Sequence, residues 1–135
     1  MSIKSYRDLD VWKLSKELAK DVYTLTKLYP SEERFGLTQQ TCRSAVSVMS
    51  NIAEGSGRRS KPEFMRFVNI ASGSLCEMEA QLLLAVDLDY VTSIEVDKIL
   101  VKADRISKML YALHQSLSKT ALPPTEYRVP GTEYA

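Results

Sequence analysis

The chain has 135 residues, and 18 Lys and Arg stand against 17 Asp and Glu, so the formal net charge is +1. This length suits a single domain with a substantial core, and 44% hydrophobic with 26% charged residues excludes a globally disordered chain. Five Gly and five Pro exclude a fibrous or low-complexity class. Because the net charge is near zero, any electrostatic function must come from local clusters of charge.

The longest uninterrupted apolar run, residues 82–86, is far shorter than the about twenty residues that cross a membrane. The first eight residues are polar and lack the apolar stretch of a secretory signal. We therefore expect a cytoplasmic protein. In that reducing compartment Cys42 and Cys76 are expected to stay thiols and to lie buried as small apolar side chains.

Apolar residues recur at helical spacing along most of the chain, beginning with residues 9–28. Pro30 ends this first helix. A second helix is predicted over residues 37–54, and Gly55 and Gly57 are expected to end it. The apolar positions of the first helix are Val11, Leu14, Leu18, Val22 and Leu25.

Capping boxes, in which Ser or Thr is followed three residues later by Glu, open the third and fourth helices at residues 60–63 and 92–95. The third helix is predicted to run to about residue 89 and the fourth to residue 122. Two prolines then break the helix. Residues 123–135 show no periodicity, and we expect them to form a flexible tail.

No stretch alternates with period two for long enough to predict a strand. Four helices joined by short loops predict an all-α fold, an up-down-up-down antiparallel four-helix bundle over residues 1–122. The third and fourth helices carry more apolar residues than one stripe needs, which usually marks an interface, so we expect a homo-oligomer. Leu82, Leu83 and Leu84 point in three directions, as do Ile99, Leu100 and Val101, and a second face of the fourth helix carries Val96, Leu100 and Tyr111.

Polar side chains interrupt the core pattern of the second helix, and the third helix carries acids nearby. These residues are Arg43, Asn51, Glu54, Glu77 and Glu79. A buried charge without a partner costs several kcal/mol, so we expect Arg43 to pair with Glu77 or Glu79, within the subunit or across a subunit boundary. A hairpin that closes at residues 57–58 supports this, because it puts Arg43 level with residues 74–76. A ligand site is the alternative.

Three motifs occur in order: FGLTQQ at 35–40, NIAEG at 51–55 and IASGSLCEME at 70–79. Over about residues 6–118 the chain resembles the bacterial four-helix-bundle family of proteins encoded in intervening sequences of 23S ribosomal RNA genes. That family includes the accessory variability proteins of diversity-generating retroelements. The resemblance implies a cyclic homopentamer, and implies nucleic-acid binding for the basic retroelement members. The net charge of +1 favours the intervening-sequence branch.

Charge is unevenly distributed along the second half of the chain. Residues 77–97 hold six acids and no Lys or Arg, whereas residues 98–119 hold five bases and one acid. In an antiparallel bundle the acids gather at one end and the bases at the other, where Arg58 and Arg59 in a Gly-rich turn are expected to reach outward. The candidates for binding RNA or DNA phosphates are Arg58, Arg59, Lys61, Lys108 and Lys119. A solvated, dipolar surface without a ligand is the alternative.

Catalytic chemistry finds little support in the sequence. The single histidine, His114, is preceded at the third position by Tyr111, so the Glu-x-x-His pairs of a di-iron bundle are missing. We expect no enzyme, no cofactor and no metal. The prediction is a non-enzymatic oligomeric RNA or ribonucleoprotein accessory factor. The alternative is a structural or protein-interaction module, with another protein as its partner, that binds no nucleic acid.

Overall fold

The computed structural model of the chain describes residues 5–121. These residues form helices and no strand, which confirms the all-α prediction. The predicted tail, residues 123–135, lies outside the described residues. In chain order the elements are η1 (Tyr6–Asp8), α1 (Asp10–Thr26), η2 (Ser31–Glu33), α2 (Leu37–Ser56), α3 (Lys61–Asp87) and α4 (Ser93–Ala121).

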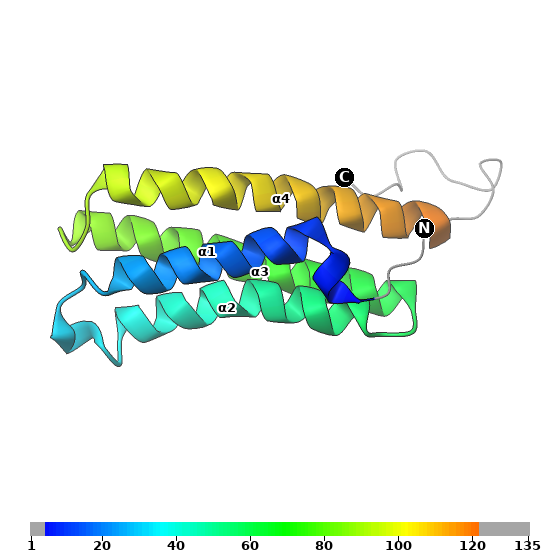
Figure 1. Cartoon of the computed structure of the whole chain (residues 1–135), viewed down its shortest axis with the longest axis horizontal. Helices are drawn as coiled ribbons and strands as arrows, with labels where there is room; N and C mark the ends of the chain where they lie inside the picture. Colours follow the sequence, from blue (N-terminus) through cyan, green and yellow to red (C-terminus); the bar gives the residue numbers. More distant parts are fainter. Residues whose placement is uncertain (1–4, 122–135) are drawn as a thin grey trace.

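The four α-helices form an antiparallel bundle in which each contacts its neighbours in the chain and α4 closes on α1 (Figure 1). Among the described helices the diagonal pairs are not in contact, so the bundle is square in section. The α2–α3 contact is the most extensive and the α1–α4 contact the least. One end of the bundle holds the α2–α3 turn and the last turn of α4, and the other holds the α1–α2 connection and the α3–α4 turn.

One apolar stripe from each helix fills the core, as the spacing predicts. Each side chain buried in this way contributes about 1.5–3 kcal/mol. The largest side chains with almost no exposed surface are Leu18, Val22, Val48, Ile52, Leu75, Met78, Leu82, Val96, Ile106 and Leu110. Val96 therefore belongs to the core and not to an outer face, whereas Leu83, Leu84, Val101 and Tyr111 are exposed.

The predicted helix starts are confirmed, but only one capping box is complete. At α4, Glu95 N–H donates to Thr92 Oγ1 at 3.2 Å and Thr92 N–H donates to Glu95 Oε1 at 2.9 Å. At α3, Ser60 Oγ accepts from Glu63 N–H at 3.2 Å. The Glu63 carboxylate is turned instead to Arg66, so the return half of the box is not formed.

The glycines at the end of α2 differ from the prediction. The helix continues to Ser56, and Gly55 is buried inside it. A Cβ at Gly55 would lie 2.7 Å from Phe67 Cβ and 2.9 Å from Phe64 Cδ1. Gly55 therefore allows α3 to approach closely, and the helix ends at Gly57.

Two further predictions are wrong. Ser47 Oγ and Ser74 Oγ are 2.8 Å apart, whereas the predicted closure puts Ser47 level with residue 70, so α2 and α3 are about one turn out of the predicted register. The reason is that Gly55 packs on Phe64 and Phe67, and the hairpin closes further along α3 than a closure at residues 57–58 implies. The other error concerns Cys76, which is exposed, while Cys42 is buried as predicted.

Candidate nucleic-acid interface

The α2–α3 turn and the last turns of α4 bring three exposed basic side chains to one end of the bundle. Arg59 lies in the turn, Lys61 opens α3, and Lys119 is in the last turn of α4 (Figure 1). Within the part of the chain that the structure describes, none of the three forms an ion pair. These residues keep their charge available to solvent.

Arg58 is held more closely than its Gly-rich turn suggests. Its guanidinium lies 3.6 Å from a Glu54 carboxylate oxygen and 4.9 Å from the centre of the Phe67 ring. The Arg66 guanidinium lies 4.5 Å from the same ring, so two arginines flank Phe67. The cation–π contact and the ion pair hold the Arg58 guanidinium against the bundle. This geometry disfavours the predicted orientation, in which Arg58 reaches outward.

Lys108 does not join this cluster. Its ammonium forms an ion pair with Asp104 at 3.1 Å, and eleven residues of α4 separate it from Lys119, a rise of about 16 Å. A phosphate bound at the α2–α3 turn therefore lies beyond the reach of Lys108. We call Arg58, Arg59, Lys61 and Lys119 the basic end.

One basic residue near this end, Arg7, was not predicted from the sequence. Arg7 lies in η1, which packs against α1 and α2 where α1 begins and α2 ends, and it is exposed beside the Tyr6 ring. A single arginine ahead of the first helix forms no local cluster. Only the antiparallel packing of α1 on α2 brings it towards Arg58 and Arg59.

The start of α3 is a weaker anion site than a bare helix terminus. Ser60 Oγ already accepts the N–H of Glu63, and Glu63 adds a negative charge in the first turn. Arg66 Nε donates to that carboxylate at 3.0 Å, and this hydrogen bond lowers the pKa of Glu63. Glu63 is therefore ionised at neutral pH and offsets part of the positive helix end.

The polar residues predicted to pair across α2 and α3 are only partly brought together. Arg43 is exposed, and in the described part of the chain it forms no ion pair with Glu77 or Glu79. Its pairing across a subunit boundary stays a prediction. Asn51 Nδ2 donates to the Ser47 carbonyl at 2.8 Å, so it closes onto its own helix.

Glu79 faces α4, where a like charge lies nearby. Burial raises the pKa of Glu79 first, and the Asp104 carboxylate raises it further. Glu77, two residues away, is exposed. The two acids therefore lie on different sides of α3, as their spacing requires.

At the opposite end of the bundle, the Glu33 carboxylate of η2 is hydrogen-bonded to the start of α2 and to the α3–α4 turn. Glu33 Oε1 accepts the Leu37 N–H at 2.9 Å, and Glu33 Oε2 accepts the Tyr90 hydroxyl at 2.7 Å. Both hydrogen bonds lower the pKa of Glu33, and the one between Glu33 and the Tyr90 hydroxyl raises the pKa of Tyr90. Acids gather at this end as predicted, but Lys27 and Arg34 lie among them, so the dipole is weaker than the sequence suggests.

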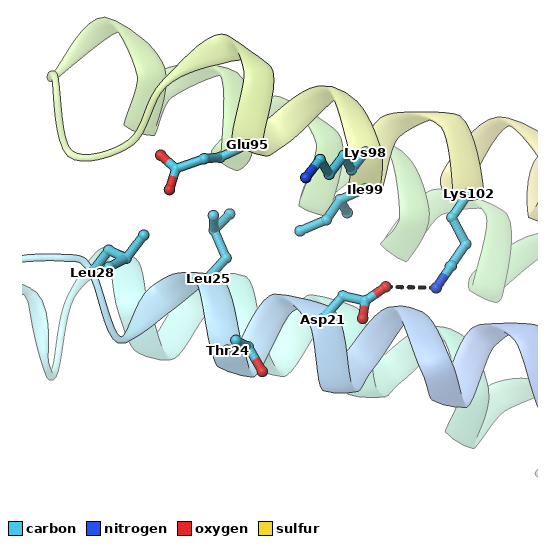
Figure 2. A pocket seen from close by; sticks show the side chains of 8 residues that line it. All are labelled: Asp21, Thr24, Leu25, Leu28, Glu95, Lys98, Ile99 and Lys102. Atoms are coloured by element: carbon cyan, nitrogen blue, oxygen red, sulfur yellow. Dashed lines mark hydrogen bonds and ion pairs between the residues drawn. The ribbon is translucent and has the colours of Figure 1, made fainter.

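A groove of about 490 Å³ lies between α1 and α2 and is lined by Lys16, Tyr23 and Met49 among others. Two more grooves lie between other pairs of helices. One, of about 460 Å³, runs between α1 and α4, where Lys102 bridges to Asp21 at 2.7 Å (Figure 2). The other, of about 360 Å³, lies between α3 and α4 and is lined by Asn69, Tyr111 and His114 among others. Neither contains a cluster of three or more His, Cys, Asp or Glu that could hold a metal ion, and none is found elsewhere in residues 5–121.

A model of the 23S rRNA-intervening sequence protein family matches residues 7–112. The chain belongs to this family. Arg7, Arg58, Arg59 and Lys61 lie within the matched residues, whereas Lys119 lies outside them.

A solved structure has the same fold, with a TM-score of 0.72 and 28% sequence identity over 77% of this chain and 97% of the other. That structure is a protein of unknown function from the S23 ribosomal protein family of Bacteroides thetaiotaomicron. A search among curated proteins found no match. Within residues 5–121, no helix of this family member is long and apolar enough to span a membrane.

Proposed function

We propose that this protein is a non-enzymatic, homo-oligomeric RNA-binding accessory factor of the cytoplasm, which binds RNA phosphates at its basic end. The observation that carries the proposal is that Arg59, Lys61 and Lys119 lie at one end of the bundle and none of them has an acidic partner within residues 5–121. The name of the family, which ties its members to 23S rRNA intervening sequences, makes RNA the first nucleic acid to test.

One copy offers only a few phosphate contacts, so a monomer is expected to bind RNA weakly. A ring repeats the basic end, and the second and later contacts become intramolecular, which raises the overall affinity by about 10²–10⁴. The resemblance to the family implies five copies. Phosphate contacts carry no sequence information, so binding is expected to depend little on RNA sequence.

The test is a salt series of binding to a mixed-sequence single-stranded RNA, followed by fluorescence anisotropy. For single strands the logarithm of the association constant falls by about 0.7 per neutralised phosphate for each tenfold increase in salt. The variant Arg59→Gln/Lys61→Gln should bind at least about tenfold more weakly at low salt and show a slope smaller by about 1.4 for each subunit engaged.

The matched control is Lys20→Gln/Lys27→Gln, which removes the same charge from exposed positions on and just after α1. It should leave affinity and slope close to those of the wild type. Equal losses in both variants would mean that binding follows net charge and not the basic end. Absence of RNA binding by the wild type at low salt would contradict the proposal.

A protein-interaction module is the second candidate, and a separate observation favours it. Large apolar side chains on and between α3 and α4 are exposed, namely Leu83, Leu84, Leu88, Ile94, Val101 and Tyr111. Exposed apolar surface of this kind usually marks contact with another protein. A wild type that stays monomeric and binds no RNA would favour this candidate.

A further inference from the structure

The contact between α1 and α4 is the least extensive of the four contacts between neighbouring α-helices. The groove along this contact is lined in part by apolar side chains. Leu25 of α1, Leu28 just after α1 and Ile99 of α4 point into the gap (Figure 2). Leu28 is 56% exposed, although it lies beside other apolar side chains. Lys98 and Lys102 stand along the α4 side of the groove.

The opposite side of the bundle presents apolar side chains of a matching kind. Ser74 is hydrogen-bonded to Ser47 of α2, and Gln81 Oε1 accepts from Ser44 Oγ of α2, so these two residues mark the edge of α3 that borders α2. Helical spacing places Glu77, Leu84 and Leu88 along the outer side of the same edge. Leu84 and Leu88 are 47% and 45% exposed. We call these three residues the leucine edge.

The leucine edge and the groove lie at the same height along the bundle. Ser72 and Leu110 line one groove and are therefore level with each other. Because α3 and α4 are antiparallel, equal steps along both helices bring Leu84 level with the α1–α4 groove and Glu77 level with Arg105. In a cyclic assembly whose axis runs along the helices, surfaces at one height are the ones that meet.

The charges on the two surfaces are complementary. Lys98, Lys102 and Arg105 share one side of α4, because they are spaced by four and three residues. Lys98, Arg105 and Glu77 form no ion pair within residues 5–121. Glu77 on the leucine edge therefore lies level with Arg105, a base that has no acidic partner among the described residues.

We propose that the leucine edge of one copy docks into the α1–α4 groove of the next copy, with Leu84 and Leu88 against Leu25, Leu28 and Ile99. The proposal rests on the homo-oligomer in the proposed function and names the two surfaces that join its subunits. Because these surfaces lie on opposite sides of the bundle, the contact is heterologous. A heterologous contact repeats from copy to copy, and it closes into a ring when the rotation from one copy to the next divides a full turn.

The test compares two neighbouring leucines by light scattering at fixed protomer concentration. Leu84→Asp places a charge in the proposed contact and should raise the subunit dissociation constant at least about 100-fold. Leu83→Asp is the matched control, since Leu83 is 53% exposed but lies about 100° further round α3, on the side of α4. It should leave the mass unchanged, and circular dichroism should show both variants folded.

A mixture tests the heterologous geometry. Leu28→Asp alters the groove and should also give monomers. Each of the two Asp variants keeps one intact surface, the groove in Leu84→Asp and the leucine edge in Leu28→Asp. Mixing them should therefore give dimers and nothing larger. Rings from the mixture, or no association at all, would overturn the proposal.

A charge exchange tests the register. Glu77→Lys and Arg105→Glu should each weaken assembly, and the double variant should recover most of the lost affinity, because the two charges meet between copies. A monomeric wild type at high micromolar concentration would refute the homo-oligomer itself. An oligomer that survives Leu84→Asp or Leu28→Asp would refute only these surfaces. If the groove instead binds a small molecule, the oligomer should survive both Leu84→Asp and Leu28→Asp.

Discussion

Two glycines of similar helical context have opposite roles in the packing. Gly55 is buried, and an added Cβ would clash with Phe64 and Phe67, whereas a Cβ at exposed Gly73 would meet nothing within 4 Å. Gly55→Ala should lower the free energy of unfolding by about 1–3 kcal/mol. Gly73→Ala should raise it by up to about 1 kcal/mol through helix propensity. Urea unfolding at fixed protomer concentration measures both changes.

A single carboxylate on α3 is expected to lower the stability of the protein at neutral pH. Burial and Asp104 raise the pKa of Glu79 above its ordinary value of 4.5, so its ionised form is disfavoured in the folded state and stability is lost as the pH rises. Glu79→Gln should therefore raise Tm at pH 7 by about 2 °C, and the gain should shrink towards pH 4. A lower Tm at pH 7 would show that the Glu79 carboxylate makes a favourable contact instead.

At the scale of elements, Glu33 ties η2 to the start of α2 and to the α3–α4 turn. The Leu37 N–H and then the Tyr90 hydroxyl lower the pKa of Glu33 below 4.5. The stability that its carboxylate contributes is present above pH 4.5 and is lost as the pH falls through the lowered pKa. Glu33→Gln should lower Tm at neutral pH and flatten the acid limb of the stability curve. Glu32→Gln, at the exposed neighbouring position, should change neither.

At the scale of the whole molecule, RNA binding and assembly are expected to be coupled. If a ring gathers several basic ends on one RNA, then a variant that cannot assemble loses the gain from effective concentration. Leu84→Asp lies far from the basic end, yet it should weaken RNA binding by about 10–100-fold and reduce the salt slope. Leu83→Asp should bind as the wild type does. Equal RNA affinity for monomer and oligomer would separate the two functions.

The helices and most of their ends could be predicted from the sequence, because the signals that set them are local. A repeat of apolar residues at three and four positions and a Ser or Thr ahead of Glu act within a turn or two of helix, as Ser60 and Thr92 show. The family and the four-helix bundle follow from the same kind of signal. The role of Gly55 was predicted wrongly, because a glycine that ends a helix and a glycine that lets a neighbouring helix approach closely give the same pattern in the sequence.

The sequence by itself determined which bases the chain carries near the α2–α3 turn and which of them follow an acid by four positions. Only the tertiary structure decided which side chains from other helices surround them. Arg58 is taken by Glu54 and Phe67, and Lys108 by Asp104, while Arg59 and Lys61 keep no acidic partner in the described residues. Arg7 joins them through the packing of α1 on α2. The physical reason is that the ion pairs of Arg58 and Lys108 join residues four positions apart and follow from local spacing, whereas the Arg58–Phe67 contact and the position of Arg7 depend on the packing between helices, which the order of residues does not set.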